Sequence, residues 1–129
     1  MRSVRLKGTF TVVAEGTVLS QREETYEIRR VEKLPKGNQW RFFARIRYGR
    51  IDVTLPLTLD VLWAGSTPVI TLDSVAIPGL GTFDARVLIH GDRYVGTWQH
   101  GDKGGHLYGV IERVADEDGD EERTGGERE

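Results

Sequence analysis

The sequence predicts an all-β protein in which about eight antiparallel strands form an up-and-down barrel. Apolar residues recur at every second position over several stretches, and this is the period of a half-buried strand. Turn signals rich in glycine separate these stretches, and no segment shows the 3.6-residue period of an amphipathic helix. A sheet with one apolar face and no covering helix buries that face by closing on itself. A β-sandwich is the second choice.

Residues 51–63, "IDVTLPLTLDVLW", are the clearest strand, because every odd position is apolar. Pro56 lies inside this run and has no N–H to donate, so we expect a bulge or a local gap in pairing there. Residues 39–48 and 82–90 alternate in the same way, whereas residues 24–34 change phase after Ile28. Turn signals lie between the strands, at 15–16, 36–38, 49–50, 65–66, 78–81, 91–92 and 101–105.

The three histidines all fall within residues 90–106, where the triplet His-Gly-Asp occurs twice. A two-residue turn at Gly91-Asp92 pairs the strand before it with the strand after it. His90 and His100 then lie at opposite ends of one strand, roughly 30 Å apart at ~3.3 Å per residue, which excludes a three-histidine site. The same pairing turns Tyr94, Gly96, Trp98 and His100 inward, and Gly96 is expected to leave room in the interior.

His100 and His106 flank the glycine-rich loop 101–105. If this loop closes symmetrically, the two imidazoles oppose each other near Asp102, where they could hold a metal ion or act in catalysis. A shift of one residue would instead separate them and turn Leu107 inward. We assign no metal and no cofactor on this pattern.

Composition describes one domain, residues 1–115, followed by an acidic tail, residues 116–129. The tail has no apolar residue, and we expect it to be disordered. The absence of cysteine excludes disulfides and thiolate chemistry. No run approaches the ~20 apolar residues that span a bilayer, and the N-terminus shows no signal peptide. A cytoplasmic location is favoured over export with a trimmed leader, and a monomer or a homodimer fits equally.

The chain contains none of the common catalytic motifs, such as a P-loop or the pattern Gly-x-Ser-x-Gly. An enzyme is therefore the less favoured interpretation. Asp73, on a strand with two rather apolar faces, would be an acid or base if it were buried alone. Such a residue more often pairs with arginine or lies at a bulge.

The aromatic residues of the apolar faces are the main candidate site. Eight-stranded barrels either hold one small ligand or are filled by their own side chains, and the sequence leaves both outcomes open. We expect a small hydrophobic or amphipathic molecule to lie inside, with His100 or His106 orienting it at one mouth. The proposed lining consists of Trp40, Phe42, Trp63, Phe83, Tyr94 and Trp98.

The alternative site is an outward stripe of arginines, Arg41, Arg45 and Arg47, with Arg50 following. Basic strands with interleaved aromatics bind single-stranded nucleic acid in other barrels. Nucleic acid or another polyanion is the less favoured partner, because Glu27 and Glu32 could pair with these arginines.

The endings "YVGTWQHG" and "GGHLYGVIE", with the strand pattern from Val4 to Val114, resemble the calycin-like barrels. These are the lipocalins, the fatty-acid-binding proteins and bacterial relatives of uncharacterised function. Lipocalins carry Gly-x-Trp on the first strand, whereas Gly96-Thr97-Trp98 lies on the penultimate one, and no helical lid is visible. Haem-binding relatives use a histidine near the mouth, which would be His100 or His106. The resemblance implies binding of a small apolar or amphipathic molecule rather than catalysis.

Overall fold

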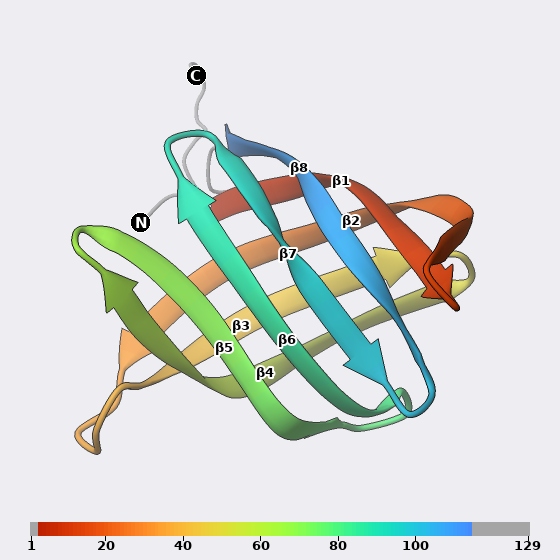
Figure 1. The fold of residues 1–129 in the computed structure, drawn as a ribbon. Coiled ribbons are helices and arrows are strands. Elements are labelled where there is room, and N and C mark those ends of the chain that lie inside the picture. Colours follow the sequence, from red (N-terminus) through yellow and green to blue (C-terminus); the bar gives the residue numbers. More distant parts are fainter. Residues whose placement is uncertain (1–2, 115–129) are drawn as a thin grey trace.

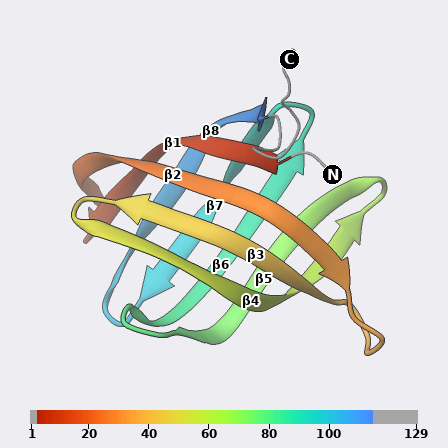
Figure 2. The same ribbon diagram turned by 180° about the vertical axis from the view of Figure 1, so that it is seen from behind.

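The computed structural model describes residues 3–114, which form eight strands and no helix. Each strand pairs antiparallel with the next, and β8 pairs with β1 to close the barrel (Figure 1 and Figure 2). The predicted all-β barrel is confirmed, and the acidic segment 116–129 lies outside the described residues. The strands are β1 (Ser3–Ala14), β2 (Thr17–Lys33), β3 (Gln39–Tyr48), β4 (Ile51–Ala64), β5 (Thr67–Ile77), β6 (Gly81–His90), β7 (Arg93–His100) and β8 (Lys103–Val114).

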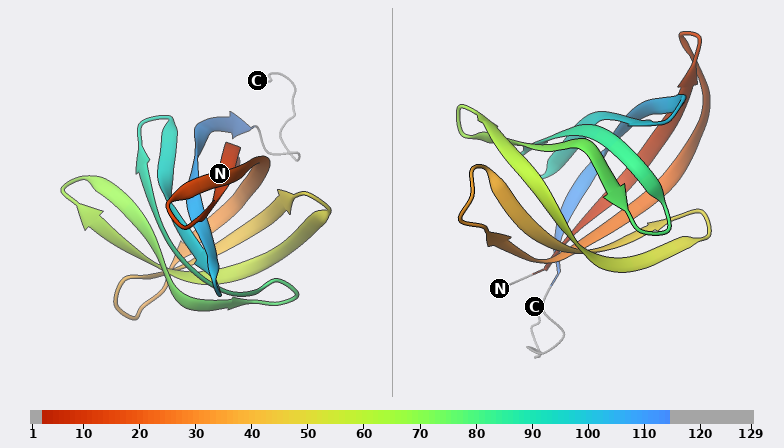
Figure 3. Two further views of the ribbon diagram at one scale, coloured as in Figure 1. Left: turned by 45° about the vertical axis from the view of Figure 1, so that its right-hand side comes forward. Right: turned by 90° about the horizontal axis from the view of Figure 1, so that it is seen from below.

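The up-and-down order places alternate hairpins at opposite ends of the barrel. The β1–β2, β3–β4, β5–β6 and β7–β8 hairpins lie together at one end, which we call the mouth end; Figure 3, left, turns this side forward. The other three hairpins share the opposite end with Ser3 and Val114. Residues 3–114 contain no helix that is long and apolar enough to cross a membrane.

The predicted turn signals mark the hairpins, with one difference at the last of them. The β7–β8 turn has two residues, Gly101 and Asp102, and Lys103 already pairs with His100. The expected five-residue loop 101–105 is therefore wrong. Gly101 has a φ of +63°, and glycine adopts this conformation without steric cost, so a tight two-residue turn forms.

Two register shifts bend the wall of the barrel. The phase change predicted after Ile28 is confirmed as an irregularity between Ile28 and Arg30. A second shift lies between Leu72 and Val75, where Ser74 has a φ of +53°. Bulges of this kind increase the twist of a strand and help a sheet to close.

Pro56 does not disturb the register between β3 and β4, since it pairs directly with Phe43. The β4–β5 ladder, however, begins only at Asp60 and ends at Ala64. From Ile51 to Leu59, β4 therefore has a ladder neighbour on the β3 side alone and behaves locally as an edge. Proline is tolerated at such a position because no partner needs its missing N–H. The expected gap is present on the β5 side, without a bulge on the β3 side.

The alternating apolar residues of β3, β4 and β6 point into the barrel, as predicted, with one exception. Trp63 is 58% exposed, although Val61, two residues earlier, is buried. The last residues of β4 and the turn that follows, 62–66, are all exposed, because this hairpin extends beyond the packed core. The prediction that Trp63 lines the interior is wrong for this reason.

Two aromatic side chains of β7 cross the neighbouring strand β8 at glycines. Tyr94 pairs with Gly109, and Trp98 pairs with Gly105. A Cβ atom at Gly109 would lie 2.8 Å from the Tyr94 ring, and one at Gly8 on β1 would lie 2.5 Å from its hydroxyl. The two glycines therefore make room for the Tyr94 side chain to reach past β8 and β1.

Trp98 makes the second crossing, over Gly105. A Cβ atom at Gly105 would overlap the carbonyl group of Thr11 on β1. The indole Nε1 of Trp98 donates to that carbonyl oxygen at 3.0 Å. The β1–β8 pairing is interrupted between Phe10 and Val13, so the indole satisfies a backbone acceptor that the ladder leaves free.

Gly96 has a different role from the expected one. A Cβ atom there would overlap the backbone carbonyl of Arg86 on β6. The missing side chain permits close approach of two strands, which is typical of a tight bend in a barrel. The expectation that Gly96 makes room in the interior is thus corrected.

We predict that Gly8→Ala lowers the free energy of unfolding by about 2 kcal/mol, because the added methyl group meets the backbone of β8 and displaces the Tyr94 hydroxyl. Urea denaturation measures the change. Gly101→Asn is the control: its turn has open space around the new Cβ atom, and asparagine tolerates positive φ. Equal stability of Gly8→Ala and the native protein would contradict the proposed crossing.

Candidate functional site: the barrel interior

The barrel encloses a cavity of about 630 Å³ that opens at the mouth end. Residues beside all four mouth-end hairpins line it: Ser20, Gly49, Leu80 and Lys103. Most of its wall is apolar and includes Ile46, Leu57, Leu59, Ile77 and Leu107. Side chains toward the opposite end, among them Val61 and Ile89, pack in the core clusters and do not line the cavity. The interior is therefore partly packed and partly hollow.

The predicted lining residues divide into two groups. Phe42, Phe83, Trp98 and His100 line the cavity. Trp40 packs, half-buried, against the core cluster of β3 and β4 without reaching the cavity. Tyr94 is 1% exposed and packs in the core with Leu6, Val87 and Leu107. It does not line the cavity, and its hydroxyl contacts a residue that does, Glu24.

The polar wall of the cavity comes from β2, and sequence reasoning missed it. Ser20, Arg22, Glu24 and Tyr26 are alternate residues of β2 that line the cavity, followed by the apolar Ile28. The intervening residues, such as Glu23, are also polar, so residues 17–25 show no amphipathic alternation. Counting back by two from the inward Tyr26 and Ile28 would have identified the row.

Glu24 is the central polar group of this wall and is 3% exposed. The Tyr26 hydroxyl donates to its Oε1 at 2.6 Å, and the Tyr94 hydroxyl donates to its Oε2 at 2.8 Å. Gly8 is the backbone partner of both Glu24 and Gly109. One row across β7, β8, β1 and β2 thus brings the Tyr94 hydroxyl to the carboxyl group.

Burial dominates the electrostatics of Glu24. It raises the pKa of the carboxyl group, while the hydrogen bonds from Tyr26 and Tyr94 partly oppose the rise. Burial and the nearby carboxylate together raise the pKa of both tyrosines. Within residues 3–114, no arginine, lysine or histidine forms an ion pair with Glu24.

The mouth carries two cationic side chains, Arg22 and Lys103. Both are exposed while lining the cavity, and neither forms a hydrogen bond or ion pair with any residue that the structure describes. Three aromatic rings that also line this cavity pack together. Phe10 packs edge-on against Tyr48 at 5.7 Å and against Trp98 at 6.0 Å between ring centroids.

His100 faces the cavity beside Phe83. Their rings stack with centroids 4.4 Å apart, and the His100 Nδ1 lies 3.0 Å from the carbonyl oxygen of Thr82. Because a carbonyl oxygen can only accept, Nδ1 carries the proton in this contact. This contact and the stacking on Phe83 hold His100 as a polar group at the cavity wall.

His106 lies on the outer surface, so the expected opposition of His100 and His106 is wrong. The two-residue turn pairs His106 with Thr97 rather than with His100, and alternation then turns its side chain outward. Its Nδ1 lies 3.2 Å from the Thr11 hydroxyl, which also accepts from the His106 backbone N–H at 2.9 Å. Among residues 3–114, no group of three acidic, histidine or cysteine side chains is placed to hold a metal ion.

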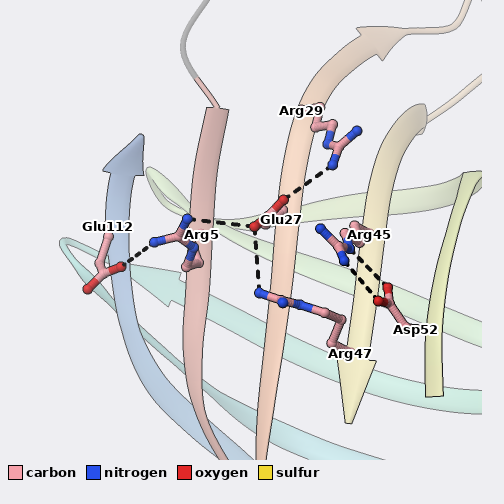
Figure 4. A network of polar contacts seen from close by, with 7 residues as sticks. All are labelled: Arg5, Glu27, Arg29, Arg45, Arg47, Asp52 and Glu112. Carbon is pink, nitrogen blue, oxygen red and sulfur yellow. Dashed lines mark hydrogen bonds and ion pairs between the residues drawn. The ribbon is translucent and has the colours of Figure 1, made fainter. Parts of the chain in front are cut away.

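The outward arginine stripe is partly neutralised by acidic neighbours (Figure 4). Arg45 makes a two-point contact with Asp52 at 2.9 and 2.8 Å, which raises the pKa of Arg45 and lowers that of Asp52. Arg47 shares Glu27 with Arg5 and Arg29 at distances from 3.4 to 3.7 Å. Arg41 and Arg50 are exposed and form no ion pair with a described residue.

Asp73 is an exposed partner of an ion pair rather than a buried acid. Its side chain is 68% exposed and contacts Arg86 at 2.9 Å. It also lies in the irregular part of β5 between Leu72 and Val75. The sequence analysis offered two ordinary explanations for Asp73, an arginine partner and a bulge, and the structure shows both.

Comparison with known proteins found no matching family model, no matching curated protein and no matching solved structure. The closed antiparallel barrel is consistent with a calycin-like fold.

The electrostatics of Glu24 predict a pH-dependent stability. A carboxyl group whose pKa is raised by folding favours the folded state at pH values below its ordinary 4.5 and loses that contribution as pH rises through the raised pKa. Glu24→Gln should therefore gain stability relative to the native protein as pH increases above 4.5. Urea denaturation from pH 4.5 to 8 measures the difference. If the difference in unfolding free energy between Glu24→Gln and the native protein does not vary with pH, the pKa of Glu24 is not raised by folding.

Tyr94→Phe tests the same contact from the other side. The variant loses a hydrogen bond to a buried carboxylate, so we expect about 1.5 kcal/mol of destabilisation near neutral pH. The loss should shrink at acidic pH, where the carboxyl group is uncharged. Tyr108→Phe, on the outer face of β8, is the matched control and should change stability little at any pH.

Proposed function

We propose that this protein binds a small hydrophobic or amphipathic molecule inside the barrel, without catalysis. The observation that carries the proposal is the cavity of about 630 Å³ with an apolar wall and a few polar side chains. Cavities of about 300–1,000 Å³ with this composition are typical of small-ligand sites. The resemblance to calycin-like barrels, which comprise lipocalins and fatty-acid-binding proteins, points to the same class of ligand.

The arrangement of the wall supports an amphipathic guest. The apolar wall of the cavity offers Leu57, Leu59 and Ile77, which would exclude water from an apolar body. The polar groups Glu24, Arg22 and His100 lie on the wall of the same cavity, where they would orient a head group. A rigid barrel that already holds this shape would lose little conformational entropy on binding.

Filling the cavity should abolish binding. Ala85 lines the cavity, and Ala85→Phe places a ring there. We expect the affinity for the neutral fluorescent probe N-phenyl-1-naphthylamine to fall at least about tenfold, a change of ~1.4 kcal/mol in binding free energy. Val95→Phe adds the same ring on the exposed outer face and should leave binding unchanged.

The tryptophan signal gives a second readout of the same titration. Among Trp40, Trp63 and Trp98, Trp98 is the one that lines the cavity, so Trp98→Phe should remove most of the energy transfer to a bound probe. Failure of the native protein to bind the probe or any of a set of fatty acids, retinoids and haem at high micromolar concentration would refute the proposed function.

A further inference from the structure

We infer that the molecule bound in the barrel carries a protonated amine, which Glu24 recognises between Tyr26 and Tyr94. This inference rests on the proposed function and specifies the chemistry of the ligand. It stands on three features of the cavity wall: a buried carboxyl group without a cation, two tyrosine hydroxyls that already donate to it, and unused acceptor positions beside a cavity.

The first feature is the missing counter-charge. Buried carboxylates are normally paired with a cation, because an unpaired charge in a low-dielectric interior is costly. Glu24 is buried and lines the cavity, yet it has no ionic partner among residues 3–114. Arg22, the next inward residue on β2, is exposed at the mouth instead of paired with it. A cationic ligand would supply the absent partner.

The second feature is the direction of the hydrogen bonds. A tyrosine hydroxyl has a single proton to donate, and those of Tyr26 and Tyr94 are both directed to Glu24. Neither is then free to donate to a ligand carbonyl or carboxylate. The two hydroxyls and the carboxyl group that they contact therefore offer acceptor positions to a ligand, which favours a ligand group that donates.

The third feature is the remaining capacity of Glu24. An ionised carboxylate offers about four acceptor positions, and the two tyrosines occupy one on each oxygen. The others remain available beside the cavity. An ammonium group, with up to three N–H donors, satisfies them and forms a charge-assisted hydrogen bond, which is roughly twice as strong as a neutral one.

The cations of the mouth define the competing ligand. Arg22 and Lys103 could attract an anionic head group such as a carboxylate. Both side chains are exposed, so water already stabilises their charge, whereas the charge of Glu24 has only two hydroxyl donors. Glu24 therefore gains more from an ionic partner than Arg22 or Lys103 does, and we expect an ammonium head group to bind more tightly than a carboxylate.

The test compares three ligands with the same twelve-carbon chain: dodecylamine, dodecanol and dodecanoate. Each competes with N-phenyl-1-naphthylamine at neutral pH and below its critical micelle concentration. In the native protein we expect dodecylamine to bind at least about tenfold more tightly than dodecanol. In Glu24→Gln this preference should disappear while dodecanol still binds. Glu23→Gln removes the same charge from the exposed outer face of β2 and should keep the preference.

A pH series on the native protein tests the inference without any substitution. As pH falls toward 4.5, Glu24 takes up a proton, so the affinity for dodecylamine should fall and that for dodecanol should not. The other titratable or charged groups facing Glu24 are Tyr26, Tyr48, Tyr94 and Arg22, and none of these residue types titrates near pH 5–7. Histidine does, and His100 lines the cavity, so the series is repeated in His100→Gln.

The outcomes separate the two proposals. Equal competition by dodecylamine and dodecanol in the native protein would overturn the amine inference and leave the proposed function intact. Tightest binding of dodecanoate, lost in Arg22→Gln, would overturn it in favour of an anionic head group at the mouth. Absence of binding by the probe and all three ligands would refute the proposed function itself.

Discussion

The polar wall of the cavity depends on one hydrogen bond, from the Tyr94 hydroxyl to Glu24, that joins β7 to β2 across two intervening strands. It forms because the positions between them in the register row, Gly109 and Gly8, have no side chains. The contact stabilises the closed wall and at the same time creates the chemistry of the cavity. The same two glycines therefore support both the packing of the wall and the arrangement of the site.

Acidic side chains are paired with arginines on the outer surface of the barrel, whereas Glu24 on the inner surface has no cationic partner among the described residues. On the outside, Glu27 forms ion pairs with three arginines and Asp52 with one, in contacts that solvent screens (Figure 4). On the inside, Glu24 has two hydroxyl donors and no cation among the described residues. A single unpaired carboxyl group in a low-dielectric cavity has more capacity to select a ligand than several paired ions in water. This contrast is the physical basis for proposing that the ligand binds in the interior.

Patterns in the sequence predicted the features that are set by residues close together in the chain, namely the strands and their turns. The alternation of residues 51–61 and 83–89 identifies which side chains face inward, because side-chain direction in a strand has a period of two. Turn residues such as Gly91-Asp92 predict hairpins and, through them, the pairing of β6 with β7. The orientation of His106 was not predictable in this way, because it depends on the length of the turn after His100. The two-residue turn places His106 on the opposite side of the sheet from the one expected with a five-residue loop.

The sequence by itself determined the all-β class, most of the strands and the aromatic character of the interior, since these follow from periodicity and turn chemistry along the chain. Only the tertiary structure decided that Trp63 lies beyond the core and that the interior contains a cavity. It alone also showed that Glu24 is buried between two tyrosines. The physical reason is that Tyr94 and Glu24 are 70 positions apart in the chain, and their contact requires the shear and closure of the whole barrel, which no local pattern encodes.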